Sequence, residues 1–433
     1  MAQLGSGRHE VDRRVVMKGL GLGAVGLASV PLLAACSPSG SGTGGGGGSL
    51  TFGSNASDPV PKKAIATFAA AFTKKTKDTV KINTTDHTTF QNKISNYLQG
   101  SPDDAFTWFA GYRMRYYANK GLVGDISDVW QKIGSNFSEG LKKASTADDG
   151  KQYFVPNYNY PWGIFYRKSV WQAKGYEIPG TFDELIKLCK KMKSDGLIPI
   201  AFADKELWPA LGTFDYLNLR INGYQFHVDL CAHKQGWDTP QVKEVFDTWK
   251  ELLPYQDPNA PGQTWQEGAQ KVVEKKAGMH LLGSFITQQF TDGKVLDDVD
   301  FFPFPAVKVE GTDAIEAPID GFMLSKKGAS NQAAKDFVGF LGTGAGQEAY
   351  NSVDNANIMT AKDADTSKYS AFTKKLAGVI ADAKSIAQFF DRDALPAMAN
   401  NVLEPAVLNF IKSGNIDLKN VESQAKSLYA QES

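Results

Sequence analysis

Short apolar segments alternate with helical hydrophobic patterns from residue 49 onward, and this alternation constrains the fold more than any other feature of the chain. Ser49–Gly53 and Val80–Asn83 are apolar runs of strand length. Between them, Ile65, Phe68 and Phe72 recur at the spacing of one helix face. Strands that alternate with helices form parallel sheets covered on both faces. The sequence therefore predicts an α/β fold built on a parallel sheet.

The same alternation continues along the chain, with recognisable helix starts. A third strand follows Pro102, and another spans Ile198–Ala203. Ser330 is predicted to cap a helix through Leu341, and the chain from about Lys362 is predicted to be helical. Two capping boxes are predicted, at Thr181 with Glu184 and at Thr264 with Glu267. In a capping box, the side chains of a threonine and of a glutamate three residues later each bond the backbone N–H of the other residue.

One stretch, KQYFVPNYNYPWGIFYRK at residues 151–168, departs from the alternation. Two strand-like runs, Tyr153–Val155 and Trp162–Tyr166, flank an irregular segment bounded by Pro156 and Pro161. Proline disfavours helix and pushes its predecessor towards extended geometry. Two amides and two aromatic rings lie between the prolines, which suits a binding surface carried on a scaffold. An ordinary loop is the alternative interpretation.

Length and charge restrict the possible partners. A chain of 433 residues exceeds what one core usually supports, so two domains are expected. Lys and Arg together number 47, and so do Asp and Glu. This balance argues against nucleic acid as a partner, because phosphate contacts need a basic surface.

The first 35 residues have the pattern of an export signal. Arg13 and Arg14 precede a weakly apolar run, residues 19–35, that is too short to cross a membrane. The segment resembles a twin-arginine signal, although Asp12 and Val16 replace the customary Ser or Thr and the customary Phe. The export route is therefore left open.

The signal ends in a sequence that resembles the bacterial lipobox, Leu33-Ala34-Ala35-Cys36. In lipoproteins with this motif the cysteine is lipidated and becomes the first mature residue. Residues 36–48 would then be the lipidated cysteine and a flexible Gly/Ser tether. We expect anchoring to the membrane through acyl chains on Cys36. The remaining cysteines, Cys189 and Cys231, could form a disulfide or stay free, and the sequence leaves both open.

Motifs for the commoner catalytic chemistries are absent from the sequence. It contains no HExxH, CxxC, P-loop or GxSxG motif, and its histidines are scattered. No metal, cofactor or catalytic residue is predicted, and we expect a binder rather than an enzyme. A carboxylate pair for glycoside hydrolysis would be close in space rather than in sequence, so a secreted carbohydrate-active enzyme stays open as an alternative.

Polar and aromatic residues gather where predicted strands end. In open α/β sheets, ligands lie beyond the carboxyl ends of the strands. Trp208 follows the strand at 198–203, and the turn after residue 282 offers backbone N–H groups at a helix start. The residues at the end of the third strand are Trp108, Phe109, Tyr112 and Arg113. For each of them, core packing is the alternative.

Together these segments resemble the extracytoplasmic solute-binding proteins of carbohydrate ABC importers, the family that includes maltose-binding protein, in an actinobacterial-type lipoprotein form. The resemblance rests on the order and spacing of many short segments rather than on a single motif. They include Asp103-Asp104 before Trp108–Gly111, Gly150–Tyr153, Trp162–Lys168, Lys276–Met279 before Gly283-Ser284-Phe285, Asp320-Gly321-Phe322, Ala334–Phe337 and Phe390-Asp391-Arg392.

The resemblance implies a two-lobed, periplasmic-binding-protein-like (type II) fold with a hinge and a cleft between the lobes. The first lobe would comprise residues 49–157 and 306–361, and the second residues 162–303 and 362–430. Residues 151–168 and the FFPFP segment at 301–305 would be crossings between them. Closure would be a rigid-body hinge motion favoured by a sugar that contacts both lobes.

The resemblance also implies a site and partners. The ligand would be a mono- or oligosaccharide, delivered to the membrane subunits of an ABC permease by a monomeric protein on the outer face of the cell membrane. Phe285 stands where many relatives have Trp, which leaves the sugar's identity open, and another polar solute such as a phosphorylated polyol is an alternative. The implied ligand contacts are Trp108, Phe109, Tyr112, Arg113, Tyr158, Asn159, Tyr160, Trp208, Ser284, Phe285, Asp320, Asp391 and Arg392.

Overall fold

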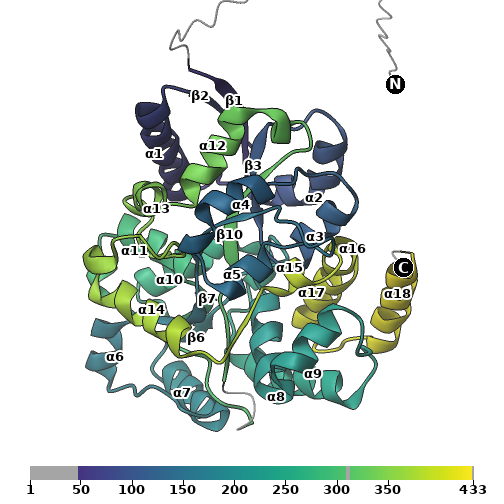
Figure 1. The fold of residues 1–433 in the computed structure, drawn as a ribbon. Coiled ribbons are helices and arrows are strands. Elements are labelled where there is room, and N and C mark those ends of the chain that lie inside the picture. The colour runs from purple at the N-terminus through teal and green to yellow at the C-terminus, as the bar shows by residue number, and fades with distance from the viewer. Residues whose placement is uncertain (1–46, 309–312, 432–433) are drawn as a thin grey trace, which may run out of the picture. The chain divides into compact units, whose positions relative to one another are not determined.

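The computed structural model of the protein describes residues 47–308 and 313–431 (Figure 1). The predicted export signal, the lipidation site Cys36 and nearly all of the tether lie outside the described residues. Among the residues that are described, no helix combines the length and apolar character needed to cross a membrane.

One sheet has six strands in the order β11-β4-β10-β3-β1-β2. β1 pairs in parallel with β2 and β3, whereas β10 runs antiparallel to both β3 and β4. β11 also runs antiparallel to β4. The sheet is therefore mixed, and the prediction of a parallel sheet was wrong for three of its five strand pairs. Hydrophobic periodicity reports burial but not strand direction, which is set by distant segments that return to the sheet. The strands are β1 Ser49–Ser54, β2 Thr79–Thr84, β3 Ala105–Phe109, β4 Val155–Asn159, β10 Ile319–Leu324 and β11 Ile358–Met359.

A second sheet has four strands in the order β6-β7-β5-β8. β6 and β7 are parallel, and β5 runs antiparallel to β7 and β8. A separate two-stranded ladder joins β9 to β12 in parallel. β12 lies in the region from about Lys362 that was predicted to be helical apart from a break at residues 389–392, so that prediction was wrong at this point. The strands are β5 Trp162–Arg167, β6 Ile198–Ala201, β7 Ala277–Gly283, β8 Val299–Phe302, β9 Ala314–Glu316 and β12 Ser385–Ala387.

The six-stranded sheet is covered by a cluster of aromatic side chains. Phe68 of α1 (Pro59–Thr76) packs edge-on against Phe337 of α12 (Gln332–Leu341), with ring centroids 5.0 Å apart. Phe52 of β1 meets Phe322 of β10 at 4.7 Å. Each fully buried Phe contributes about 1.5–3 kcal/mol to folding, so this cluster fixes α1 and α12 on the sheet.

Local capping agrees with the sequence in two places and differs in one. The capping boxes at the starts of α7 (Phe182–Ser194) and α10 (Trp265–Val273) are both present, which confirms the predictions. The cap of α12 is Asn331 rather than Ser330, because its side chain accepts hydrogen bonds from the backbone N–H groups of Ala333 and Ala334.

The remaining helices surround the two sheets (Figure 1). α2 and α4 lie with α1 and α12 on the six-stranded sheet, and α8 and α9 lie beside the four-stranded sheet with α7. The bounds are α2 His87–Gln99, α3 Tyr112–Asn119, α4 Ser127–Ile133, α5 Glu139–Ala144, α6 Lys168–Lys174, α8 Leu211–Cys231, α9 Pro240–Leu252, α11 Thr287–Asp292, α13 Gly344–Asn351, α14 Ala371–Asp382, α15 Phe390–Asp393, α16 Pro396–Met398, α17 Glu404–Ser413 and α18 Leu418–Ala430.

The chain passes from the six-stranded to the four-stranded sheet at Tyr160–Pro161, between β4 and β5. The irregular segment predicted here was wrong, because β4 extends through Asn159 instead of ending at Val155. Pro156 fits into this inner strand opposite Gly321, where the register between β4 and β10 shifts. A Cβ at Gly321 would collide with the backbone of β4, so the glycine permits this close approach.

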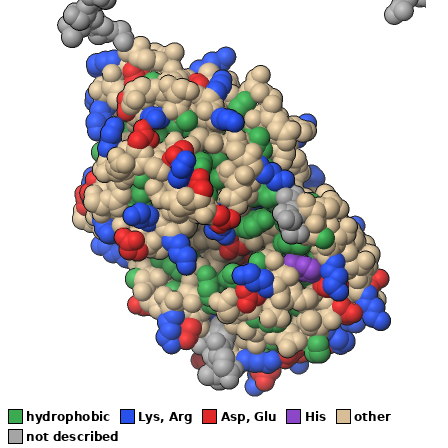
Figure 2. Space-filling view, turned by 45° about the vertical axis from the view of Figure 1, so that its right-hand side comes forward, with side chains coloured by type: hydrophobic (Ala, Val, Ile, Leu, Met, Phe, Trp, Pro, Cys, Tyr) green, Lys and Arg blue, Asp and Glu red, His purple; other side chains and the backbone are tan. Residues whose placement is uncertain are grey.

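Two further features concern the surface and the thiols. On the face shown in Figure 2, Lys and Arg side chains are interspersed with Asp and Glu, as the balanced composition predicts. Cys189 and Cys231, whose pairing the sequence left open, are both buried and free. Burial raises the pKa of the Cys189 thiol to about 12.

Candidate functional site

The principal pocket lies beyond the carboxyl ends of the parallel strands, where the fold class predicts it. The cavity has a volume of about 170 Å³. Its lining includes residues that follow strands of all three sheets: Asn55 after β1, Asp86 after β2, Glu206 and Trp208 after β6, Phe285 after β7, and Phe389 after β12.

One wall of the pocket is aromatic. Trp162, at the start of β5, packs against Phe389 with ring centroids 4.7 Å apart. Trp208 and Phe285 meet Trp162 edge to face at 6.3 Å and 6.0 Å, and Trp265 meets Phe285 in the same way at 5.0 Å. Such edge-to-face contacts hold each ring in a fixed orientation, so the wall is rigid before any ligand arrives.

Another part of the pocket lining is built around Arg392. Its Nη1 donates to Asp320 Oδ1 at 2.5 Å, and its Nε lies 3.6 Å from Asp391 Oδ1. The guanidinium rests 3.8 Å from the ring centroid of Phe109 and 5.3 Å from that of Tyr160. Burial would lower the pKa of Arg392, but the negative charges of Asp320 and Asp391 and the Tyr160 ring outweigh it and raise that pKa. Arg392 is therefore a permanent cation.

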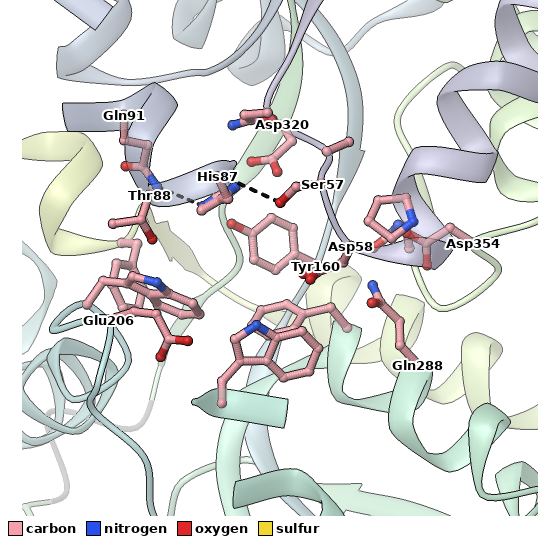
Figure 3. A pocket seen from close by; sticks show the side chains of 18 of the residues that line it. Ser57, Asp58, His87, Thr88, Gln91, Tyr160, Glu206, Gln288, Asp320 and Asp354 are labelled. Carbon is pink, nitrogen blue, oxygen red and sulfur yellow. Dashed lines mark hydrogen bonds between the residues drawn. The ribbon is translucent and has the colours of Figure 1, made fainter. Parts of the chain in front are cut away.

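The carboxyl groups in the pocket are held in a partly dry environment. Burial raises the pKa of Asp320 above its usual range, although the charge of Arg392 opposes that rise. Burial also raises the pKa of Asp354 to about 6, and raises the pKa values of Glu206 and Asp58. Figure 3 shows Asp320 and His87 above Tyr160, and Glu206 and Gln288 below it.

A chain of hydrogen bonds fixes His87 and its neighbour Gln91 on α2. Arg113 Nη1 donates to Gln91 Oε1 at 2.7 Å, and a guanidinium can only donate, so the Gln91 amide nitrogen faces away from it. That nitrogen lies 2.7 Å from His87 Nε2 and donates to it. The ring of His87 is therefore neutral, and it also bonds the backbone of Asn55. Burial, with the charge of Arg392, lowers the pKa of His87 to about 4.

Several buried polar atoms in the pocket lining have no hydrogen-bond partner among the described residues. They include the donors Trp162 Nε1 and Asn55 Nδ2 and the acceptor Glu206 Oε2. A buried polar group without a partner costs about 1–3 kcal/mol. Unpartnered donors and acceptors that line one pocket are therefore positioned to be satisfied by a ligand with several hydroxyl groups.

The residues implied by the sequence fall into two groups. Seven line the pocket and six do not. Those in the lining are Tyr158, Tyr160, Trp208, Phe285, Asp320, Asp391 and Arg392. Those outside it are Trp108, Phe109, Tyr112, Arg113, Asn159 and Ser284.

Two of the residues outside the lining support it from behind. Phe109 carries Arg392 on its ring face, and Arg113 orients Gln91. Asn159 Nδ2 donates to the backbone of Ala317 at 3.1 Å. Trp108, with 1% of its surface exposed, packs in a separate core cluster with side chains of α2 and α3, as the core-packing alternative predicts.

Part of the lining was not predicted from the sequence. The rule that placed candidates after the third strand would also have found the residues after β1 and β2. Trp162 lies within the stretch 151–168 that was singled out, and Phe389 adjoins Phe390-Asp391-Arg392, but neither was named as a ligand contact. The missed side chains include Asn55, Ser57, Asp58, Asp86, His87, Thr88, Gln91, Trp162, Glu206, Trp265, Gln266, Gln288, Asp354, Asn357 and Phe389.

Comparison with known proteins identifies the family. Residues 56–348 match the model of the bacterial extracellular solute-binding proteins, which is more than half of the chain. The chain belongs to this family. The solute-binding protein is also similar to a solved bacterial solute receptor, AcbH, described as having an exclusive substrate preference for β-D-galactopyranose. The two chains are 46% identical, with a TM-score of 0.86, over 89% of this chain and 100% of that one.

Curated relatives are more distant. The solute-binding protein is 30% identical to the diacetylchitobiose binding protein DasA of Streptomyces coelicolor, over 63% of this chain and 64% of the relative. It is 26% identical to an uncharacterised ABC transporter extracellular-binding protein of Pyrococcus horikoshii, over 64% of this chain and 62% of the relative. These matches therefore span less than two thirds of the relatives' own lengths.

Proposed function

We propose that this protein is the sugar-capturing component of an ABC importer. The observation that carries the proposal is the combination in one pocket of a rigid aromatic wall and unpartnered buried polar atoms. A sugar presents C–H faces, which pack on aromatic rings, and hydroxyl groups, which both donate and accept hydrogen bonds. No single apolar or ionic ligand would satisfy both sides of such a pocket.

The charges of the pocket favour a neutral sugar. Among the described residues in the lining, Arg392 is the only Lys or Arg, and two carboxylates already neighbour it. His87 is uncharged at neutral pH because its pKa is about 4. Further carboxyl groups lie on Asp58, Glu206 and other lining residues. An anionic ligand, such as a phosphorylated polyol, would therefore meet net negative charge.

The 46% identical receptor AcbH makes β-D-galactopyranose the first candidate ligand. A monosaccharide agrees with the pocket's chemistry, because polar groups lie close to the aromatic wall. The donor Trp162 Nε1 belongs to the wall itself. Arg392 packs on Tyr160, and the ring of Tyr160 lies 5.8 Å from that of Phe285. We infer that the sugar ring lies on the aromatic side chains with its hydroxyl groups directed towards Arg392, Asp391 and Glu206.

The proposal extends to delivery. The lobes that carry the two larger sheets would close on the sugar by a hinge at the crossing segments, and the closed form would dock on the permease. A hydrogen bond from Gln266 Nε2 to Asp58 Oδ1, 3.0 Å long, joins α10 to the start of α1 within the pocket lining. The protein would act as a monomer without catalytic activity, held at the outer face of the membrane by a lipid on Cys36.

A thermal-shift screen of the mature protein against neutral and charged sugars tests the binding function. Ligand at 100 times its Kd stabilises the folded state by about 2.7 kcal/mol, so a true ligand raises the melting temperature measurably. D-galactose is expected to do so, and galactose 6-phosphate is not. A panel in which no saccharide raises the melting temperature would overturn the proposal. Release of free galactose from lactose would instead establish an enzyme.

The lipid anchor has its own test. Wild-type protein expressed in a host that processes lipoproteins is expected in the membrane fraction, and the Cys36→Ser variant in the soluble fraction. A Cys36→Ser protein that stays in the membrane would remove the anchor from the proposal without affecting sugar binding.

A further inference from the structure

Trp162, the central ring of the aromatic wall, is held from behind by α8. The hydroxyl of Tyr216 on α8 donates to the backbone carbonyl of Trp162 at 2.5 Å, which fixes the position of its main chain. One turn earlier on the same helix, Gly212 faces the six-membered ring of the indole. A Cβ at Gly212 would come within 2.7 Å of Cε3 of Trp162 and still closer to Cζ3.

Gly283, at the end of β7, has the same relation to the neighbouring ring. A Cβ there would lie 2.7 Å from Cδ1 of Phe285, closer still to Cε1, and 3.1 Å from Nε1 of Trp162. The backbone of Gly283 has φ −75° and ψ 161°, which any residue adopts. Its lack of a side chain is therefore explained by the rings and not by the backbone.

A methyl group at either glycine would displace the rings in one direction. Trp162 packs on Phe389 at 4.7 Å, and its main chain is held by β5 and Tyr216. Protein interiors are close-packed, so a displaced ring moves towards empty space. Trp162 and Phe285 both line the pocket, so the pocket offers empty space to either ring.

We propose that Gly212 and Gly283 are specificity-determining residues. Because they lack side chains, the rings of Trp162 and Phe285 can pack against them and stay out of the pocket, and this sets how large a sugar the pocket admits. This inference rests on the proposed sugar-binding function. Neither glycine lines the pocket itself, so both act through the rings of Trp162 and Phe285. A methyl group is close in size to the hydroxymethyl group that distinguishes a hexose from a pentose.

The test compares Gly212→Ala and Gly283→Ala with the wild type by calorimetric titration with D-galactose and with L-arabinose. L-arabinose has the configuration of galactose but lacks its hydroxymethyl group. One misplaced carbon in a packed pocket changes binding about 10- to 200-fold. We expect each variant to lose at least about 10-fold in affinity for galactose and clearly less for arabinose. Equal losses for the two sugars, or no loss, would overturn the inference.

Gly378→Ala is the matched control. Gly378 lies within α14, and a Cβ there would meet nothing within 4 Å. In a helix, alanine is favoured over glycine, so this variant is expected to be slightly more stable and to bind both sugars as the wild type does.

A double variant separates ring displacement from a general loss of structure. Phenylalanine lacks the outer indole atoms that a Cβ at Gly212 would strike, so Gly212→Ala should cost little further affinity in a Trp162→Phe background. If Gly212→Ala alone fails to fold, the double variant is still expected to fold and to bind as Trp162→Phe does. A double variant as impaired as the sum of both changes would refute the role of the indole.

Near-ultraviolet circular dichroism distinguishes failure of the inference from failure of the proposed function. Gly212→Ala is expected to change the indole signal, whereas Gly378→Ala is not. If the wild type binds no saccharide, the proposed function fails and this inference fails with it, even where the signal shows a displaced ring. If the wild type binds galactose and Gly212→Ala binds both sugars unchanged, the inference alone fails.

Discussion

Replacing Arg392 by Met should destabilise the protein severely, because it removes the cation between the buried carboxylate of Asp391 and the partly buried carboxylate of Asp320. The side chain of Arg392 is 7% exposed, and those of Asp320 and Asp391 are 22% and 5% exposed. Breaking a buried ion pair by removing one partner costs about 3–5 kcal/mol, because the remaining charge is left uncompensated. Methionine keeps much of the arginine's length, so the loss is mainly electrostatic. We therefore expect the free energy of unfolding to fall by about 3–5 kcal/mol at pH 7.

The effect should depend on pH with a definite sign. Burial already raises the pKa of Asp320, and loss of Arg392 removes the positive charge that opposes this rise. As the pH falls towards 5, a growing share of Asp320 in the variant is protonated and neutral, so the penalty shrinks. The Asp320→Asn/Arg392→Met double variant removes the charge altogether and should recover much of the lost stability at pH 7.

Urea unfolding followed by circular dichroism at pH 7 and pH 5 measures these differences. Arg115→Met serves as a control, since Arg115 is a half-buried arginine on α3 whose guanidinium lies 6.0 Å from the ring centroid of Tyr112. It should change stability by about 1 kcal/mol or less. A loss below about 1 kcal/mol in Arg392→Met, or an equal loss at both pH values, would refute the account of Arg392 as the compensating charge of the site.

Three further predictions concern single side chains. Trp208→Ala should weaken sugar binding by about 1–3 kcal/mol in calorimetric titration, the scale of one buried aromatic side chain, and unchanged affinity would assign Trp208 to packing alone. Burial raises the pKa of Glu404 to about 7, so the folded protein holds this proton more tightly than the unfolded chain does. The resulting contribution to the free energy of unfolding is lost as the pH rises from about 4.3 through 7. Glu404→Gln should flatten the melting temperature over that window, and an unchanged slope would contradict this assignment. Gln266→Ala removes the hydrogen bond to Asp58 and should lower sugar affinity about 3- to 10-fold. It should also increase the radius of gyration of the sugar-free protein in X-ray scattering, and an unchanged radius would exclude a role of this bond in closure.

Features with short-range causes could be predicted from the sequence. Both capping boxes were predicted correctly, because a threonine and a glutamate three residues apart meet within one helical turn. The choice between Ser330 and Asn331 as the cap of α12 could not be predicted, since both side chains suit the position. The structure selects Asn331, whose extended backbone directs its oxygen at two free N–H groups.

Features that depend on distant segments could not be predicted. Pro156 suggested an irregular segment, but Gly321, far away in sequence, provides the space that keeps Pro156 within a strand. Trp108 and Trp208 both lie close to strand ends, yet the first packs in a core and the second lines the pocket. Only the packing of α2 and α3 over Trp108 distinguishes them, and no local pattern reports it.

Calorimetric titration of the mature protein with D-galactose and, separately, with galactose 6-phosphate tests whether the pocket binds a neutral sugar. We expect saturable binding of one galactose per protein with a Kd in the micromolar range or tighter, which corresponds to a binding free energy of about −8 kcal/mol or better, and no binding of the phosphate ester. Binding of the phosphate ester as tight as that of galactose, or no heat from either, would contradict this expectation.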